Sequence, residues 1–362
     1  MTATTAAAAS ARVNPLTTGQ LPAWSPWAIL LGSWVLVGGV FALMNTGGDP
    51  ADFNIAATLF LGTVLFVVLL TVFSSVAENR RRAVDRLVTS LVSSAFVIVL
   101  IPLVSLLYTV VVNGLDRFDA EFFSSSMRNI VGEGGGAVHA IWGTLLITLG
   151  AAVISVPIGL MTAIYLVEYG RGKLAKAITF LVDVMTGIPS IVAGLFAAAV
   201  FVIFFGPGTY MGIAGSVALS VLMIPVVVRS SEEMLRLVPN ELREASYALG
   251  VPKWLTIMKV VMPTSIAGIT TGVTLAISRV IGETAPLVLT AGITASLNTN
   301  LFSGPMTTLP VLVFSQYRSP GIDPTEALDR AWAGALTLIL IVMALNLVAR
   351  LVAKIFAPKL GR

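Results

Sequence analysis

The chain has 362 residues, of which 56% are hydrophobic and only 11% are charged. Soluble domains carry about 25% charged residues, so 22 basic and 18 acidic side chains are too few to cover a soluble surface of this size. The absence of cysteine excludes disulfides, thiolate metal sites and a cysteine nucleophile, and the single histidine, His139, argues against a histidine-based metal centre. A net charge of +4 is too small to indicate a nucleic-acid partner. The composition is therefore that of a membrane protein.

Eight apolar stretches are long enough to cross a bilayer. A spanning helix needs about 20 mostly apolar residues, whereas barrel strands show about ten residues of alternating polarity. The continuous runs in this chain therefore predict helices. In chain order, the predicted spans are Trp24–Met44, Ile55–Val76, Leu87–Val112, Ala140–Val167, Ala177–Phe205, Met211–Val228, Ile266–Gly292 and Ala331–Val352. The predicted fold class is an all-α polytopic membrane protein with about eight transmembrane helices.

The basic residues predict the orientation of these spans. Lysine and arginine near span ends stay on the cytoplasmic side. With the N-terminus inside, 17 of the 22 basic residues fall in inside segments and four in outside segments, while Arg279 lies within a span. Both termini are therefore predicted to be cytoplasmic. Residues 1–23 are predicted to be disordered, residues 24–86 to form an N-terminal transmembrane hairpin, and residues 87–362 to form a six-span core.

The loop between the sixth and seventh spans, residues 229–263, carries a predicted helix. Asn240 is a candidate N-cap, Glu241 complements the helix dipole in the first turn, and Gly250 followed by Pro252 stops the helix. A helix of about nine residues is too short to be stable alone, so it needs a surface to lie on. That surface is either the chain's own membrane helices or a partner protein, and the helix signals leave both open.

The same loop resembles the EAA loop of ATP-binding-cassette (ABC) import permeases. In that motif Glu-Ala-Ala is followed after three residues by Gly, and after nine more by Ile-x-Leu-Pro. The matching residues of this chain, with three conservative replacements, are Glu244-Ala245-Ser246, Gly250 and Val260-Val261-Met262-Pro263. The resemblance implies that this helix is a coupling helix, which sits in a groove of a cytoplasmic ATPase.

Two charges, Arg279 and Glu283, lie within the predicted seventh span. Four residues apart on one helix, their side chains can contact each other. An unpaired charge at the bilayer centre costs about 2.5–3.5 kcal/mol even on the lower scales, so both must face protein or water. Pro286 is expected to kink or unwind the helix one turn beyond Glu283. Two interpretations remain: an ion pair that fixes helix packing, or a site where the guanidinium binds a tetrahedral oxyanion and Glu283 holds it at other times.

The segment Arg279–Leu287 resembles the Arg-x-x-Gly-Glu-Thr-Ala-Pro-Leu segment of PstA-type permeases, the membrane subunits of a high-affinity phosphate importer. A second segment, Thr186–Leu195, resembles the Gly-Ile-Pro-Ser-Ile-Val-x-Gly segment of these permeases. The resemblance covers the chain from about Leu87 to its end, and the N-terminal hairpin departs from the family's common six-span form. It implies that Arg279, Glu283 and Thr284 belong to the substrate pathway.

Two further charges are candidates for the same pathway. Asp183, near the cytoplasmic start of the fifth span, either pairs with a pathway arginine or extends to the lipid headgroups. Arg229 closes the sixth span four residues after Pro225. It is either a positive-inside anchor or, by its resemblance to a Pro-x-x-x-Arg pattern of phosphate permeases, a second pathway arginine.

The resemblance implies a complex that imports inorganic phosphate across a bacterial plasma membrane by alternating access. The implied partners are a homologous PstC-type permease, two copies of a PstB-type ATPase, an external PstS-type phosphate-binding protein and membrane lipids. The chain has no Gly-x-x-x-x-Gly-Lys-[Ser/Thr] loop, so we expect it to be neither an enzyme nor a holder of cofactors, with ATP and Mg²⁺ on the ATPase. The alternatives are a permease for another oxyanion, such as molybdate or sulfate, and an ion-coupled secondary transporter or membrane scaffold without an ATPase.

Overall fold

The computed structural model of the chain describes residues 21–44 and 54–356. These residues form helices joined by turns and loops, and no strand occurs among them. Their contacts divide the chain into two compact units between Leu106 and Leu107. Most of the segment predicted to be disordered, most of the turn predicted between the first two spans, and the basic residues Lys359 and Arg362 lie outside the described residues.

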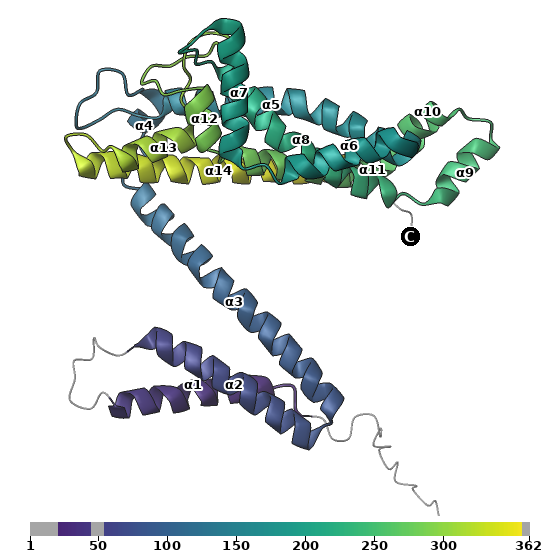
Figure 1. Ribbon diagram of the computed structural model, residues 1–362. Helices are drawn as coiled ribbons and strands as arrows, with labels where there is room; N and C mark the ends of the chain where they lie inside the picture. The colour runs from purple at the N-terminus through teal and green to yellow at the C-terminus, as the bar shows by residue number, and fades with distance from the viewer. Residues whose placement is uncertain (1–20, 45–53, 357–362) are drawn as a thin grey trace, which may run out of the picture. The chain divides into compact units, whose positions relative to one another are not determined.

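The first unit contains a helical hairpin and the beginning of a long third helix (Figure 1). Its helices are α1 (Ser25–Met44), α2 (Ile55–Ala77) and the N-terminal part of α3 (Arg80–Gly114). α1 and α2 pack closely at Gly62, where a Cβ atom would lie 2.5 Å from Cδ1 of the Trp34 indole. The indole N–H donates a hydrogen bond to Thr63 Oγ1 (3.2 Å). Small and polar residues therefore hold two otherwise apolar helices together.

A buried carboxylate fixes the turn between α2 and α3. Only 1% of the Glu78 side chain is exposed, and it accepts hydrogen bonds from Ser74 Oγ (2.5 Å), Arg86 Nη2 (2.8 Å) and the Leu21 N–H (2.9 Å). Burial alone raises the pKa of this carboxyl, but the three hydrogen bonds and the Arg86 charge lower its pKa to about 2. Because the folded-state pKa is depressed, the stabilisation by Glu78 is fully present above its ordinary pKa of 4.5 and is lost as the pH falls toward about 2.

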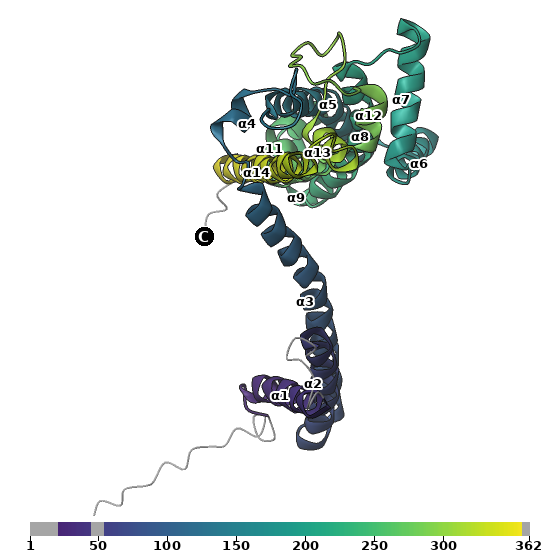
Figure 2. The same ribbon diagram turned by 90° about the vertical axis from the view of Figure 1, so that its left-hand side faces the viewer.

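The second unit is a bundle of membrane helices arranged around α8 (Figures 1 and 2). After the end of α3, its helices are α4 (Ala120–Ser124), α5 (Val138–Ile164), α6 (Gly172–Thr186), α7 (Ser190–Phe205), α8 (Gly212–Arg236), α9 (Asn240–Ala248), α10 (Lys253–Thr256), α11 (Met262–Val280), α12 (Ala285–Thr290), α13 (Leu309–Arg318) and α14 (Pro324–Phe356). α8 contacts α5, α6, α7, α11 and α12. Glycines allow these contacts to be close: a Cβ at Gly150 of α5 would lie 2.5 Å from Ser216 Oγ, and one at Gly272 of α11 would lie 2.5 Å from Ser230 Oγ.

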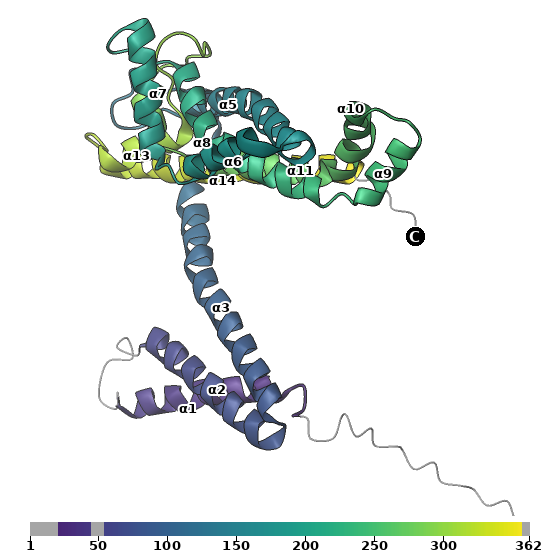
Figure 3. The ribbon, with the colours of Figure 1, turned by 45° about the vertical axis from the view of Figure 1, so that its right-hand side comes forward.

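Seven of the described helices are long and apolar enough to cross a membrane, or eight if the bent pair α6–α7 counts as one span. This confirms the predicted all-α polytopic fold class. The predicted fifth span, Ala177–Phe205, is wrong as one continuous helix, because α6 and α7 differ in direction by 108° (Figure 3). Pro189 explains the break, since it has no N–H to donate and disfavours a helical conformation at Ile188.

The predicted seventh span, Ile266–Gly292, begins earlier and is interrupted. The helix begins at α10 and continues through a π-helical turn, Ile257–Val261, into α11, which ends at Val280. Pro286 lies in the first turn of α12, where a missing N–H is tolerated. The expected interruption of the helix is therefore present, but it lies at residues 281–284, before the proline, and the expected position one turn beyond Glu283 is wrong.

The helices flanking the EAA-like loop are longer than hydropathy predicts. α8 continues for two turns beyond Val228, to Arg236, and the next helix begins at Lys253. Hydropathy places a span end where charges begin, but an amphipathic helix continues past that point. Of the predicted loop 229–263, only residues 237–252 lie outside these two long helices.

Candidate functional site

The two segments that resemble permease motifs lie side by side. α7 packs against α12 (Figure 2), and a Cβ at Gly194 of α7 would lie only 2.5 Å from Pro286 Cα. Ile188, in the break between α6 and α7, packs on a buried cluster that contains Val280 and Leu287. Two interrupted membrane helices therefore meet. Non-helical backbone at membrane depth is tolerated where it is buried in protein or lines a cavity, and transporters place substrate sites at such discontinuous helices.

Arg279 and Glu283 do not make the contact that their spacing on one continuous helix would allow. Arg279 lies in the last turn of α11 with an exposed side chain, whereas Glu283 is half-buried in the non-helical stretch before α12. Neither charged side chain has an ion-pair or hydrogen-bond partner among the residues that the structure describes. The physical reason is the helix end at Val280, which removes the i, i+4 geometry. Thr284 is the half-buried residue preceding α12, and its side chain makes no cap hydrogen bond.

Asp183 pairs with an arginine, as one of its two interpretations requires. Its carboxylate, 58% exposed on α6, forms an ion pair with Arg229 Nη2 of α8. Arg229 Nη1 also contacts Glu232 Oε2 (2.9 Å), and Glu232 Oε1 accepts from Arg236 Nη2 (2.6 Å). The Glu232 side chain is only 7% exposed, so it is the buried centre of this four-residue network.

Arg229 and Arg279 lie at different depths along two antiparallel helices. Gly272 of α11 contacts Ser230 of α8, and this register places Arg279 level with Met223 of α8. Met223 precedes Arg229 by six residues, which corresponds to about 9 Å along the helix axis. The two guanidinium-bearing residues are therefore separated by nearly two helical turns.

The charge network leads to a stability prediction. Asp183→Asn is expected to cost about 1 kcal/mol or less, because the pair is exposed and Arg229 keeps its contact with Glu232. Glu232→Gln is expected to cost at least about 2 kcal/mol, because it removes a buried charge that receives two charge-assisted hydrogen bonds. Thermal unfolding of the purified transporter measures both. An equal loss in the two variants would contradict the placement of Glu232 at the centre.

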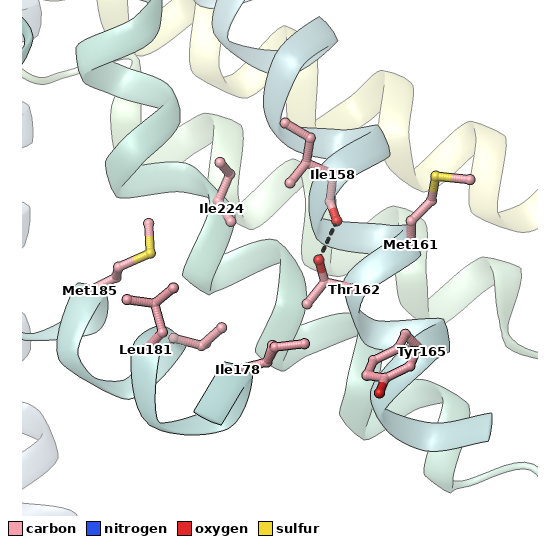
Figure 4. A pocket seen from close by; sticks show the side chains of 9 residues that line it. Ile158, Met161, Thr162, Tyr165, Ile178, Leu181, Met185 and Ile224 are labelled. Carbon is pink, nitrogen blue, oxygen red and sulfur yellow. Dashed lines mark hydrogen bonds between the residues drawn. The ribbon is translucent and has the colours of Figure 1, made fainter. Parts of the chain in front are cut away.

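The cavity between α5, α6 and α8 is a poor anion site (Figure 4). It has a volume of about 500 Å³ and is lined by Ile158, Met161, Thr162, Tyr165, Ile178, Leu181, Val182, Met185 and Ile224. None of these side chains is charged, and the Thr162 hydroxyl already donates to the Ile158 carbonyl oxygen (2.7 Å). The cavity is therefore apolar, and the charged residues described above remain the candidates for binding an anion.

The predicted helix in the EAA-like loop is confirmed, with a correction at its start. α9 spans Asn240–Ala248, but the N-cap position is occupied by Pro239, and Asn240 Oδ1 instead lies 3.3 Å from Arg243 Nη1. At its other end the Gly250 N–H donates to the Tyr247 carbonyl oxygen (2.9 Å) and the Val251 N–H to the Ser246 carbonyl oxygen (3.3 Å). Gly250 has φ +75°, so this closure requires a residue that adopts the left-handed conformation.

The apolar face of α9 is not covered by the chain itself. Leu242 is 42% exposed and Leu249 is 83% exposed, and Ala245 between them is also exposed. Glu244 is exposed, whereas Ser246 is buried and its hydroxyl lies 2.8 Å from Thr256 Oγ1 of α10. Pro263 lies in the first turn of α11 and is exposed. The exposed leucines count against the interpretation that α9 buries its apolar face under its own membrane helices.

Arg243 and Glu168 hold α9 in place, and neither residue is among the predicted site residues. Arg243 Nη2 lies 2.9 Å from Glu168 Oε1, and Nε donates to the same oxygen (3.0 Å). Arg243 also donates to the carbonyl oxygens of Leu235 (3.0 Å), in the last turn of α8, and of Val238 (2.6 Å), in the linker that follows. The side chains are only 12% and 4% exposed, respectively. The one available signal was a carboxylate, Glu168, at the end of a long apolar run.

Comparisons with known proteins agree with this architecture. Residues 155–362 match the sequence model of the binding-protein-dependent transport system inner membrane component. The chain is 45% identical over 276 residues to the phosphate transport system permease protein PstA 1 of Mycobacterium tuberculosis (strain CDC 1551 / Oshkosh), which covers 75% of this chain and 90% of that protein. It is 46% identical over 273 residues to PstA of Mycobacterium leprae (strain TN), and 40% identical over 280 residues to PstA of Yersinia pestis. These two alignments cover 74% and 77% of this chain and 88% and 92% of the relatives.

The fold also matches that of a solved importer. A chain of the MetNI methionine ABC transporter in an inward-facing conformation superposes with a TM-score of 0.51 at 20% identity, covering 61% of this chain and 96% of the other. At this identity the match concerns the fold alone. The alignments with the relatives extend over most of the chain, and the family-model match includes both motif segments. The chain therefore belongs to the binding-protein-dependent transport system inner membrane components and, among these ABC importer subunits, to the PstA-type permeases.

Proposed function

We propose that this chain is the permease subunit through which an ABC importer moves inorganic phosphate into the cytoplasm by alternating access. The relatives described above are phosphate transport permeases, and this supports the choice of substrate. The observation that carries the proposal is Arg279, an exposed guanidinium without an ion-pair partner among the described residues, at the end of an apolar membrane helix.

Arg279 has to face something other than lipid. Leaving an arginine against hydrocarbon costs about 2.5–3.5 kcal/mol or more. A second, PstC-type permease and a water-filled passage between the two subunits would provide the required polar surroundings. A permanently charged guanidinium then offers two parallel N–H donors to a tetrahedral oxyanion.

Glu283 supplies a means of distinguishing phosphate from other oxyanions. An ionised carboxylate is an acceptor only. Near neutral pH inorganic phosphate still carries protons and can donate a P–OH hydrogen bond to it, whereas sulfate and molybdate carry none. Half-buried next to the interruption between α11 and α12, Glu283 would accept from phosphate and repel a fully deprotonated anion. Thr284 adds a hydroxyl in the same non-helical stretch.

Arg229 would form the second position of the pathway. Arg229 lies about 9 Å along α8 from the level of Arg279, on the side toward α9. Its guanidinium is paired with the partly exposed carboxylate of Asp183. A phosphate arriving from Arg279 would exchange with Asp183, which keeps the guanidinium compensated when no anion is bound. Release then requires only that Asp183 pair with Arg229 again.

The exposed face of α9 is the proposed contact for the ATPase. Leu242, Ala245 and Leu249 supply an apolar surface beside the carboxylate of Glu244, and Gly250 closes the helix. The positive-inside distribution of lysine and arginine supports a cytoplasmic position for this loop and for both termini. A dimer of PstB-type ATPases would receive α9 in a groove and hold ATP and Mg²⁺, while a PstS-type protein delivers phosphate from outside. Residues 87–362 would form the permease domain and residues 24–86 an appended hairpin.

Oxyanion competition tests the substrate. In cells that lack other phosphate importers, uptake of radiolabelled phosphate is expected to be abolished by excess unlabelled phosphate or arsenate, because arsenate has the same shape and protonation. A hundredfold excess of sulfate or molybdate, which cannot donate to Glu283, is expected to change uptake by less than about twofold. Strong inhibition by either would favour a permease for that anion instead.

A further inference from the structure

The proposed coupling helix α9 is held by a side-chain contact to a membrane helix that is distant from it in the sequence. Backbone linkers join α9 directly to α8 and α10. Glu168, by contrast, lies in the π-helical turn Tyr165–Tyr169 that extends α5, 75 residues before Arg243. Two nitrogens of the Arg243 guanidinium contact this carboxylate. The guanidinium also donates to the carbonyl oxygen of Leu235 in the last turn of α8 and to that of Val238 in the following linker. One side chain thus connects α9 to the ends of both α5 and α8.

We propose that Arg243 and Glu168 form a positioning joint that makes α9, α5 and α8 move as one rigid body when the ATPase displaces α9. This rests on the proposed coupling of α9 to an ATPase. Without the joint, α9 is a nine-residue helix held by its two linkers and by the Ser246 contact with α10, and it could shift relative to α5 and α8. With the joint, a displacement of α9 is passed to α5 and α8 together.

Burial and packing support a joint that stays closed during the cycle. The carboxylate of Glu168 is 4% exposed, and separating it from Arg243 would leave a buried charge uncompensated. α5 and α8 are themselves closely packed, since a Cβ at Gly159 would lie 2.7 Å from a Val227 methyl group. Packed helices of this kind move as units and are not freely deformable.

A second tether keeps the fold intact when the joint is removed. Lys253 Nζ of α10 donates to the backbone oxygen of Glu168 and lies 4.8 Å above the Tyr169 ring. The Ser246–Thr256 hydrogen bond also remains. Variants at Arg243 and Glu168 are therefore expected to fold and assemble, but with a less rigid connection between α9 and the ends of α5 and α8.

Cross-linking tests the joint directly, because the chain contains no cysteine. In the Arg243→Cys/Glu168→Cys double variant, reconstituted with its ATPase and binding protein, ATP hydrolysis is expected to persist while phosphate transported per ATP falls about tenfold. A short thiol-specific bifunctional reagent that links the two cysteines is expected to restore the parental ratio. A merely structural defect would not be rescued, and each single-cysteine variant treated with the reagent controls for modification.

The possible results distinguish a failure of the proposed joint from a failure of the proposed function. Arg171→Leu, which removes an exposed arginine at the N-cap of α6, is expected to keep the parental ratio. A parental ratio in the unlinked double variant, or a loss of transport on cross-linking, would overturn the joint. Absence of ATP-dependent phosphate uptake by the unmodified chain would instead overturn the proposed function.

Discussion

Replacing Arg279 with Gln is expected to reduce phosphate uptake about a hundredfold or more, because a neutral amide replaces both charge-assisted donors. Each hydrogen bond to a charged group contributes about 1.5–3 kcal/mol, and the guanidinium fork makes two. Assembly is expected to be normal, since the exposed side chain has no hydrogen-bond or ion-pair partner among the described residues. The measurements are the initial rate of radiolabelled phosphate uptake and co-purification of the ATPase.

Two further variants control this result. Arg279→Lys keeps the charge but not the planar fork, so an intermediate uptake rate is expected. Arg350→Gln removes an exposed arginine near the end of α14 and is expected to transport at the parental rate. Parental uptake by Arg279→Gln would remove Arg279 from the pathway.

Replacing Gly250 with Val is expected to uncouple ATP hydrolysis from transport. The left-handed conformation at φ +75° costs a residue with a side chain roughly 1–2 kcal/mol, and more when that side chain is β-branched. The strain is relieved by opening the end of α9, where the N–H groups of Gly250 and Val251 close the helix. We therefore expect several-fold less phosphate transported per ATP, with ATPase activity retained.

The backbone origin of this effect can be isolated. Asn visits the left-handed conformation more readily than Val, so Gly250→Asn is expected to be much milder. Gly208, in the turn between α7 and α8, has φ +77° and equally open surroundings, and Gly208→Val imposes the same strain away from α9. Loss of coupling in Gly208→Val, or equal coupling in Gly250→Val and Gly250→Asn, would contradict the role assigned to the helix end.

Much of the fold follows from local signals in the sequence. Long apolar runs located the membrane helices, and Gly250 with Pro252 located the end of α9, because these signals act within one turn of the chain. Prolines were harder to interpret. Pro189 divides one predicted span by 108°, and Pro286 begins a new helix instead of kinking the old one. Hydropathy does not register a change in helix direction, since the two parts together form one apolar stretch.

The contacts between charged residues could not be predicted from local sequence signals, because they depend on the tertiary structure. The i, i+4 spacing would allow a contact between Arg279 and Glu283 on one continuous helix, but the helix ends between them. Asp183 and Arg229 are 46 residues apart, and Glu168 and Arg243 are 75 apart. Such pairs depend on which helix faces meet, and neither spacing nor composition specifies that.

The most direct test is phosphate uptake by proteoliposomes that contain this chain, its partner permease and the ATPase, with the binding protein outside. Uptake is expected to require ATP and Mg²⁺ on the side of α9 and to be unaffected by ionophores that collapse ion gradients. Uptake that proceeds without the ATPase and follows an imposed ion gradient would contradict ATP-driven import and favour an ion-coupled secondary transporter.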